Sequence, residues 1–269
     1  MGAGTVVLVG CGQMGSAMLR GWLQSNAASR FVIVEPAGAP EAFAAAPHVA
    51  AHRVVSELDD ALAPDAVVFA VKPQVIGDIV PAYRRFVRPG TVFMSIAAGT
   101  TIANLAKHLG DAAIVRVMPN TPAAIGRAIS VACANPRVTA AQRQLCDALL
   151  AAIGESTWVE DEGLLDAVTA VSGSGPAYVF LLIETLAEAG AKAGLPPDLA
   201  LHLAQATVAG AGELARVSSE SPARLRENVT SPGGTTRAAL DVLMAGDGLA
   251  ALMTRAVAAA TARSRELAS

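Results

Sequence analysis

The chain has 269 residues, enough for two modest domains, and its 53% hydrophobic residues can build a sizeable core. A net charge of −3 argues against binding to nucleic acid, and three scattered cysteines exclude a disulfide framework or a metal cluster. The longest strongly apolar run, residues 177–183, ends at Glu184, and no signal peptide is evident, so we predict a cytoplasmic protein without a membrane partner.

Short β-type runs alternate with helical stretches over the first 160 residues, which indicates a parallel sheet with crossover helices. The first helix is expected over residues 13–24. The last two of the predicted strands are expected to be antiparallel to the others. The predicted strands are residues 5–9, 31–35, 66–71, 91–96, 113–118, 128–133 and 155–159.

After Asp161 the strand signals end and helical runs follow, broken at residues 172–176, 194–197, 218–222 and 231–234. We therefore predict an α/β chain: an N-terminal Rossmann-type, doubly wound sheet over residues 1–160, then an all-α domain over residues 161–269. The run 177–193 is apolar around most of its circumference in its first part, so we expect it to be buried against a second subunit.

The segment Val7-Leu-Val-Gly10-Cys-Gly12-Gln-Met-Gly15 ends the first strand and opens the first helix. It is the G-x-G-x-x-G pattern in its required context: Gly10 makes the tight turn, Gly12 admits a pyrophosphate, and Gly15 lets the helix pack on the strand. A strand–helix turn without a ligand is the alternative. We assign the whole loop to the coenzyme, with Cys11 as a small loop residue rather than a nucleophile. The assigned residues are Gly10, Cys11, Gly12, Gln13, Met14 and Gly15.

Glu35 ends the second strand, twenty residues after Gly15. An acid at this place usually binds the ribose 2′-hydroxyl, which favours NAD over NADP. The following residues 36–40 offer no Arg, Lys or Ser for a 2′-phosphate. A solvated acid at a strand end is the alternative.

Ligands of open α/β sheets bind beyond the carboxyl ends of the strands. Those ends carry Val71-Lys72-Pro73, Ala97-Ala98-Gly99 and Pro119-Asn120, which we assign to the coenzyme. Lys72 is equally compatible with an ordinary surface lysine, and Asn-Thr-Pro is also simply a good turn. Ser172-Gly-Ser-Gly-Pro176 opens the long helix of the second domain, either as a lid over the nicotinamide or as a capping turn with proline in the first helical turn.

Residues 230–236, Thr-Ser-Pro-Gly-Gly-Thr-Thr, lead directly into a helix. The unpaired amides and positive dipole end of that helix, together with two glycines and nearby hydroxyls, suit a small carboxylate. A capped interhelical turn is the alternative. No histidine lies in a strand-end loop, and no paired carboxylates or Cys/His metal spacing appear near these motifs. An iminium substrate fits this pattern, because its carbon is already positive and accepts hydride without a strong general acid.

These motifs together resemble the pyrroline-5-carboxylate reductases, the enzymes that complete proline synthesis. The resemblance covers nearly the whole chain, and the segment Leu225–Thr236 is its most specific part. The motifs are Val9–Gly15, Ala70–Pro73, Ser95–Gly99, Met118–Pro122, Val171–Tyr178 and Leu225–Thr236.

The resemblance implies hydride transfer from NADH or NADPH to L-1-pyrroline-5-carboxylate, giving L-proline. It implies that Thr236 lies near the ring nitrogen, where it donates or relays the proton, and that Ala97, Pro119 and Pro176 flank the nicotinamide. It also implies a homodimer, often assembled into a ring of dimers, with the site shared between subunits. The implied carboxylate-binding residues are Ser231, Gly233, Gly234, Thr235 and Thr236.

This chain differs from many relatives in the residues after the second strand. Those relatives carry polar or basic residues there and use NADPH. Glu35 and the residues after it lead us to expect that NADH is used at least as well. Two other functions are weighed. One alternative is a β-hydroxyacid dehydrogenase or another imine reductase, which shares the two-domain layout. The β-hydroxyacid dehydrogenases carry a catalytic lysine on the long helix, and the corresponding position here is Val179. A regulatory dinucleotide-binding protein has no reason to keep the turn at 231–236.

Overall fold

The computed structural model describes residues 3–44 and 46–268. The chain divides into two compact units, one within Met1–Gly173 and Ala260–Ser269, the other Ser174–Ala259. The first unit is built on an eight-stranded sheet and the second is helical, so the predicted fold class is confirmed.

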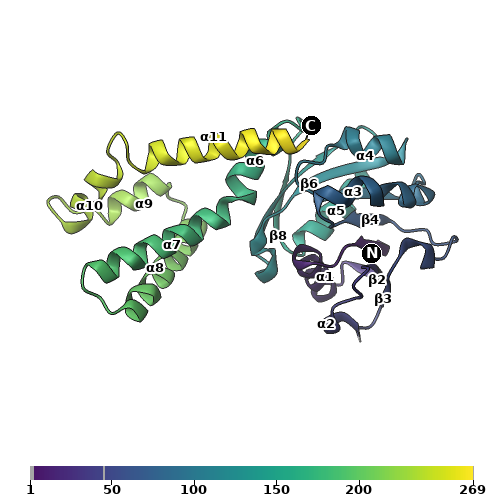
Figure 1. Cartoon of the computed structure of the whole chain (residues 1–269), viewed down its shortest axis with the longest axis horizontal. Helices are drawn as coiled ribbons and strands as arrows, with labels where there is room; N and C mark the ends of the chain where they lie inside the picture. Colours follow the sequence, from purple (N-terminus) through teal and green to yellow (C-terminus); the bar gives the residue numbers. More distant parts are fainter. Residues whose placement is uncertain (1–2, 45, 269) are drawn as a thin grey trace. The chain divides into compact units, whose positions relative to one another are not determined.

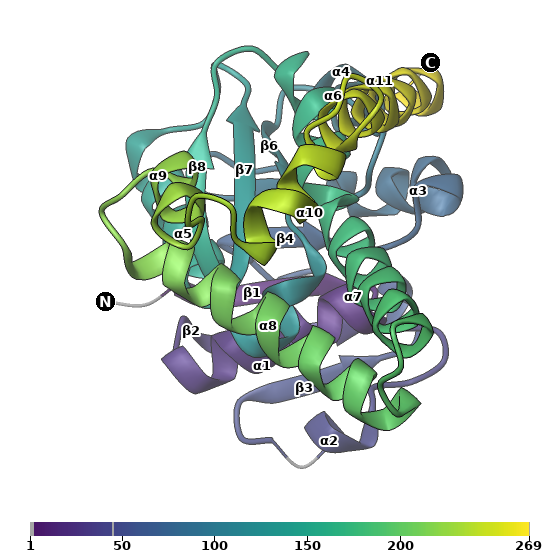
Figure 2. The same cartoon turned by 90° about the vertical axis from the view of Figure 1, so that its left-hand side faces the viewer.

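The sheet has the strand order β3-β2-β1-β4-β5-β6-β7-β8 (Figures 1 and 2). The first six strands are parallel, in the doubly wound order that opens a crevice beyond the carboxyl end of β1. β7 runs antiparallel to β6, and β8 pairs parallel with β7, as predicted for the last two strands. The strands are β1 (Ala3–Val9), β2 (Ala28–Val34), β3 (Val49–His52), β4 (Ala66–Phe69), β5 (Val92–Ser95), β6 (Ala113–Met118), β7 (Ala128–Ala134) and β8 (Gly154–Trp158).

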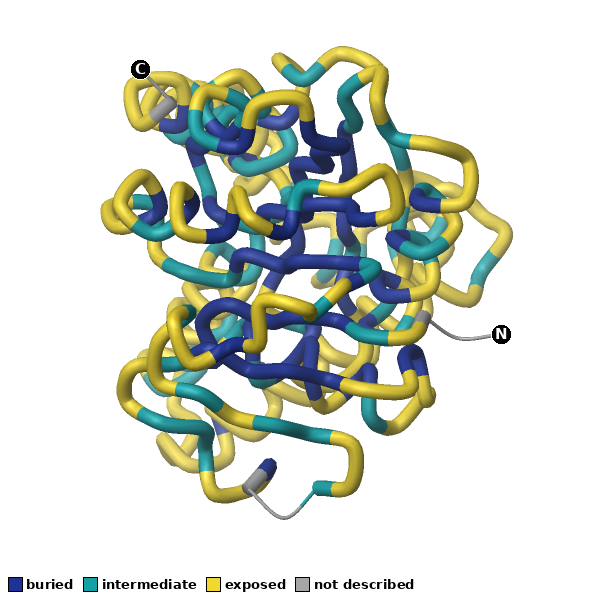
Figure 3. Tube along the Cα trace, turned by 90° about the vertical axis from the view of Figure 1, so that its right-hand side faces the viewer, coloured by how far each residue is buried: buried dark blue, intermediate teal, exposed yellow. Residues whose placement is uncertain are grey.

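Both faces of the central strands are buried, which is why their sequences are continuous apolar runs rather than alternating ones (Figure 3). Val6 and Leu8 face a core shared with α1 and α5, whereas Val7 and Val9 face a core shared with α3, α4 and the turn after α3. The helices and helical turns of this unit are α1 (Gln13–Ser25), α2 (Glu41–Ala44), η1 (Val55–Glu57), α3 (Pro73–Ile79), η2 (Val80–Phe86), α4 (Ile102–Leu109), η3 (Thr121–Ile125), α5 (Ala140–Ala151), α6 (Leu164–Val168) and the π-helical turn η4 (Thr169–Gly173).

The second unit consists of helices, and the predicted breaks at 172–176, 194–197, 218–222 and 231–234 each lie at or next to a helix boundary. α7 and α8 pack as a helical hairpin joined by residues 193–196. A further break at residues 244–248, which the sequence analysis did not identify, separates α10 from α11. The helices are α7 (Gly175–Lys192), α8 (Pro197–Val217), α9 (Pro222–Asn228), α10 (Thr235–Leu243) and α11 (Leu249–Ala268), whose end from Ala260 belongs to the first unit.

Helix α7 has no buried residue within the single chain. Phe180 is 59% exposed, and large apolar side chains of α8 are exposed as well. By length and composition alone the stretch Leu164–Lys192 is able to cross a membrane, but one such stretch is weak evidence, and Glu184 and Glu188 lie within it. Apolar side chains exposed together along two helices are typical of a surface that a partner covers.

Candidate active site

The loop between β1 and α1 holds three glycines for three different physical reasons. Gly10 has φ +89°, and a Cβ there would lie 2.7 Å from the carbonyl oxygen of Ala70. A Cβ on Gly15 would collide with the carbonyl oxygen of Gly10, so its absence lets helix α1 pack against the loop. A Cβ on Gly12 would meet no atom within 4 Å. The fold therefore needs Gly10 and Gly15, whereas the open space over Gly12 is room for a ligand.

The N-terminus of α1 is open. Gly12 occupies the cap position without a side-chain hydrogen bond, and the first turn of the helix contains no acidic residue. Its free amides and the positive end of the helix dipole therefore favour the binding of an anion. Cys11 lies within this loop but is buried, and burial raises the pKa of its thiol, so the thiol stays protonated and unreactive at neutral pH.

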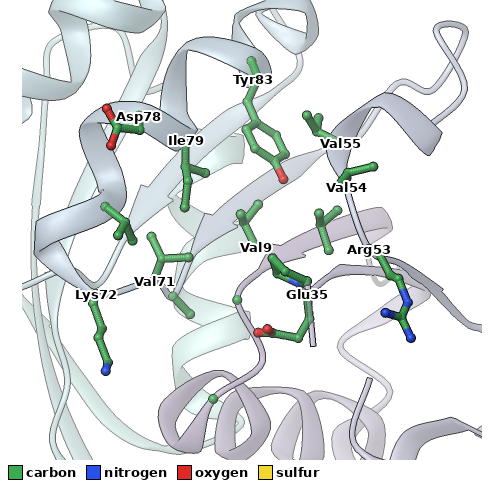
Figure 4. A pocket seen from close by; sticks show the side chains of 17 residues that line it. Val9, Glu35, Arg53, Val54, Val55, Val71, Lys72, Asp78, Ile79 and Tyr83 are labelled. Atoms are coloured by element: carbon green, nitrogen blue, oxygen red, sulfur yellow. The ribbon is translucent and has the colours of Figure 1, made fainter. Parts of the chain in front are cut away.

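Glu35 follows β2 and holds its carboxylate beside the loop. Its Oε2 accepts a hydrogen bond of 2.8 Å from the amide of Cys11, and its Oε1 accepts one of 3.2 Å from the amide of Ala37. Figure 4 shows the carboxylate turned toward the loop. The sequence-predicted acid is therefore fixed in place at the edge of the crevice.

A cavity of about 510 Å³, here called the β2 cavity, opens beside Glu35 (Figure 4). Apolar side chains line its centre, among them Val54, Ile79 and Tyr83. Charged side chains stand at its margins. Those that line it are Glu35, Arg53, Lys72 and Asp78. A largely apolar slot with an acid at the carboxyl end of β2 suits an adenosine group.

Arg53 is one of the charged lining residues that the sequence analysis did not identify. It follows β3, a strand that the sequence analysis did not predict because Val49-Ala-Ala-His52 lacks the β-branched and aromatic pattern of the other strands. A signal was present, because a third parallel strand belongs after the crossover that follows the second strand of this fold.

A second cavity of about 480 Å³, here called the β5 cavity, lies beyond the carboxyl ends of β1, β4, β5 and β6. It brings together four segments that are far apart in sequence, as expected for a ligand site beyond the carboxyl ends of parallel strands. Met118 and Gly173 also line it. The predicted coenzyme residues gathered there are Gly12, Gln13, Met14, Val71, Lys72, Pro73, Ala97, Ala98, Pro119 and Asn120.

Asn120 is held by the protein itself. Its Oδ1 accepts a 3.0 Å hydrogen bond from the amide of Ile129, and its Nδ2 lies 3.3 Å from the Oγ of Ser172 and 3.4 Å from its carbonyl oxygen. The side chain therefore ties the end of β6 to the π-helical turn before α7. Such turns often occur at functional sites, and here Asn120 positions one wall of the β5 cavity.

Gly99 lines neither of these two cavities. Its φ is +74°, and a Cβ there would approach Leu267 of α11 to 3.0 Å. It lets the Ala97–Gly99 turn pack under the end of that helix. Its contribution to the site is to shape the turn that carries Ala97 and Ala98.

The turn at Ser231–Gly234 lies in the second unit. Gly233 has φ +68°, and the amide of Gly234 donates a 3.1 Å hydrogen bond to the carbonyl oxygen of Ser231. Gly234 then caps α10 without a side-chain hydrogen bond, and the first turn of α10 holds no acid. Ser231 and Thr235 are exposed, and Thr236 is half-buried. The turn therefore offers free amides and hydroxyls to a small anion.

Pro176 also lies in the second unit, in the first turn of α7. The residues that line the β5 cavity all belong to the first unit. Among the described residues, no group of three or more His, Cys, Asp or Glu side chains is arranged to hold a metal ion. No histidine lines the β2 or the β5 cavity.

Comparison with known proteins gives consistent matches for both halves of the chain. Residues 162–267 match the family model for pyrroline-5-carboxylate reductase dimerisation, and residues 5–99 match the model for NADP oxidoreductase, coenzyme F420-dependent. A pyrroline-5-carboxylate reductase of Pisum sativum is 40% identical over 98% of this chain and 96% of its own length.

Solved structures agree with this similarity. A pyrroline-5-carboxylate reductase from Coxiella burnetii superimposes with a TM-score of 0.89 at 32% identity, covering 99% of both chains. A pyrroline carboxylate reductase from Plasmodium falciparum with NADP bound gives a TM-score of 0.84 at 29% identity, covering 98% of both chains.

Proposed function

This chain belongs to the pyrroline-5-carboxylate reductase family, and from that membership we propose how its own residues perform the reaction. The protein reduces the C=N bond of L-1-pyrroline-5-carboxylate to give L-proline, with NAD(P)H as reductant. We propose that residues 1–160 form the coenzyme-binding domain and residues 161–269 the dimerisation and substrate-binding domain.

The coenzyme, when bound, supplies the hydride from its reduced nicotinamide. The open helix end at Gly12 holds the pyrophosphate, and the β2 cavity holds the adenosine beside Glu35. The β5 cavity receives the nicotinamide, with Ala97 and Pro119 in its wall. Pro176, in the first turn of α7, is assigned to the nicotinamide as the family resemblance implies. The two cavities adjoin each other, which supports this assignment: both are lined by Gly12, Ala70, Val71 and Lys72.

One observation carries the substrate assignment: the uncapped start of α10 after the turn Ser231–Gly234. Its amides and hydroxyls bind the carboxylate of the substrate, and this carboxylate seat consists of Ser231, Gly233, Gly234 and Thr235. Thr236 then sets its hydroxyl near the ring nitrogen and donates or relays the proton. Because an iminium carbon is already electrophilic, orienting it toward the nicotinamide supplies most of what the reaction needs.

A substrate panel tests this function directly. Purified protein is given NADH or NADPH with L-1-pyrroline-5-carboxylate, and the loss of reduced coenzyme is followed together with the appearance of proline. Ketoacids, and hydroxyacids with the oxidised coenzyme, serve as the comparison set. Turnover of the imine alone is the expected result, while turnover of a hydroxyacid or ketoacid but not of the imine contradicts it.

The coenzyme preference is expected to favour NADH or to be balanced. The carboxylate of Glu35 accepts hydrogen bonds from ribose hydroxyls and repels a 2′-phosphate. Against this stand the NADP-bound relative from Plasmodium falciparum and the NADP oxidoreductase match over residues 5–99. We expect kcat/KM for NADH to equal or exceed that for NADPH at saturating imine. A preference for NADPH of more than about tenfold would contradict this expectation.

We further propose that the protein is a cytoplasmic homodimer, which assembles further into a ring of dimers. The exposed apolar surface of α7 and α8 needs a cover, and the dimerisation match spans both helices. A second copy of this chain is the natural cover, because a two-fold interface joins like surfaces. In such a dimer each site combines the coenzyme of one subunit with the carboxylate turn of the other.

Charge placed on α7 is expected to separate the subunits. Phe180→Glu puts a carboxylate where a 59% exposed phenylalanine offers apolar surface, and a buried unpaired charge is strongly unfavourable. Light scattering should give a multiple of 27.2 kDa for the natural protein and the single-chain mass for the variant. Val54→Glu, an apolar-to-acid change at a 47% exposed position in the first unit, is the control and should keep the natural mass. A natural protein with the mass of one chain would contradict the dimer.

A further inference from the structure

The end of β3 lies next to the end of β2, and this places Arg53 opposite Glu35. In the parallel pairing Val34 is in register with His52, and the amide of Glu35 donates a 3.0 Å hydrogen bond to the carbonyl oxygen of His52. Glu35 and Arg53 are thus the next residues on two neighbouring strands, at the sheet edge where ligands bind. Both line the β2 cavity, and Figure 4 shows the Glu35 carboxylate turned toward the glycine loop with the Arg53 side chain to its right.

The guanidinium of Arg53 has no ion-pair partner among the described residues, and the side chain is exposed. The nearby acids bond to groups other than the guanidinium of Arg53. Glu57 accepts a 2.9 Å hydrogen bond from the backbone amide of Arg53 and lies 3.7 Å from the His52 ring. The carboxylate of Glu35 accepts from the amides of Cys11 and Ala37.

The other cation of the β2 cavity lies at a different margin. Figure 4 shows Lys72 beyond Val71, on the side away from Arg53. Residues 36–40, which follow Glu35 directly, contain no basic side chain. Of the two basic residues that line the cavity, Arg53 is therefore the one next in register to Glu35, and it is the basic partner for a negative group on a ribose bound there.

We propose that Arg53 is the specificity residue that binds the 2′-phosphate of NADPH in this protein. The proposal rests on the proposed function, because it takes the β2 cavity as the adenosine site. A guanidinium binds phosphate oxygens through two parallel N–H groups, a fork that a lysine lacks. Glu35 serves the ribose hydroxyls of NADH and Arg53 serves the phosphate of NADPH, so one sheet edge accepts both coenzymes.

Steady-state kinetics with both coenzymes test the assignment. Arg53→Ala should lower kcat/KM for NADPH by about tenfold or more, the effect of losing charge-assisted hydrogen bonds, and leave that for NADH within twofold. Arg53→Lys should lie between the two proteins. Arg30→Ala, which removes an exposed arginine at the opposite end of β2, is the matched control and should change neither coenzyme. A loss for NADPH that exceeds the loss for NADH by less than fivefold overturns the proposal.

Binding without turnover separates this proposal from the proposed function. Adenosine 2′,5′-bisphosphate and AMP differ only by the 2′-phosphate, and calorimetry measures both with the natural protein and with Arg53→Ala. We expect tighter binding of the bisphosphate to the natural protein and loss of that difference in the variant, with a smaller difference at high salt. Equal binding of the two nucleotides to the natural protein overturns the role of Arg53, whatever substrate the enzyme reduces.

Discussion

Replacing Gly12 by valine is expected to abolish coenzyme binding while leaving the stability of the fold unchanged. A Cβ at this position meets no protein atom within 4 Å, so the side chain has room in the folded chain. It then occupies the space over the open start of α1, where the pyrophosphate binds. Losing two hydrogen bonds to a charged group, each about 1.5–3 kcal/mol, weakens binding by about a hundredfold or more.

The neighbouring glycine provides the contrast. Gly15→Ala puts a Cβ against the carbonyl oxygen of Gly10, so the helix must shift, and we expect a loss of stability of about 1–3 kcal/mol. Thermal unfolding and NADH titration of both variants distinguish the two effects. Gly12→Val should unfold at the natural temperature and fail to bind NADH, whereas Gly15→Ala should unfold earlier. Intact NADH binding by Gly12→Val would remove this loop from the coenzyme site.

The sequence motif predicts the separate roles of the three glycines in this loop, and the structure agrees with that division. What the motif does not provide is the atoms that a side chain would meet: Ala70, which follows β4, at Gly10, and the carbonyl oxygen of Gly10 at Gly15. These neighbours depend on the tertiary fold and on the path of the loop. The motif therefore predicts which glycine faces a ligand, whereas the physical reason for the other two requires the tertiary contacts.

Strand β3 and Arg53 illustrate what the sequence analysis could not reach. The run Val49–His52 is short and half-exposed, and two of its four residues are alanine, so propensity gives little indication of a strand. Its pairing with β2 determines its role, and pairing register is a non-local property. The sequence-based argument for NADH considered only the residues that follow Glu35 in the chain, and thus overlooked the arginine that lies beside it in space.

Helix α7 illustrates the opposite case, in which the sequence indicates more burial than one chain provides. Its apolar circumference predicts burial on all sides, yet the single chain leaves Phe180 and Leu181 more than half exposed. An amino-acid sequence is adapted to the complete assembly, so its apolar pattern includes surfaces that another subunit covers. This difference is what the dimer of the proposed function explains.

Thr236→Ala is expected to lower kcat/KM for the imine strongly while leaving NADH affinity unchanged. The residue lies in the first turn of α10, two residues after Gly234 of the anion-binding turn, and its side chain is half-buried. Alanine keeps the helix and removes only the hydroxyl and a methyl group. Loss of one hydrogen bond to a charged reacting group corresponds to about 1–3 kcal/mol, or about five- to 150-fold in kcat/KM.

Two further variants identify the hydroxyl as the cause of that loss. Thr236→Ser keeps the hydroxyl and should recover most of the activity. Thr254→Ala removes an exposed threonine hydroxyl that bonds only to the backbone of its own helix, 2.9 Å from the carbonyl oxygen of Ala250, and should leave kcat/KM unchanged. If the carboxylate seat and the proton donor are separate, Thr236→Ala lowers kcat more than it raises KM, because the seat at Ser231–Thr235 still binds the substrate. Unchanged turnover in Thr236→Ala would exclude this hydroxyl from the reaction.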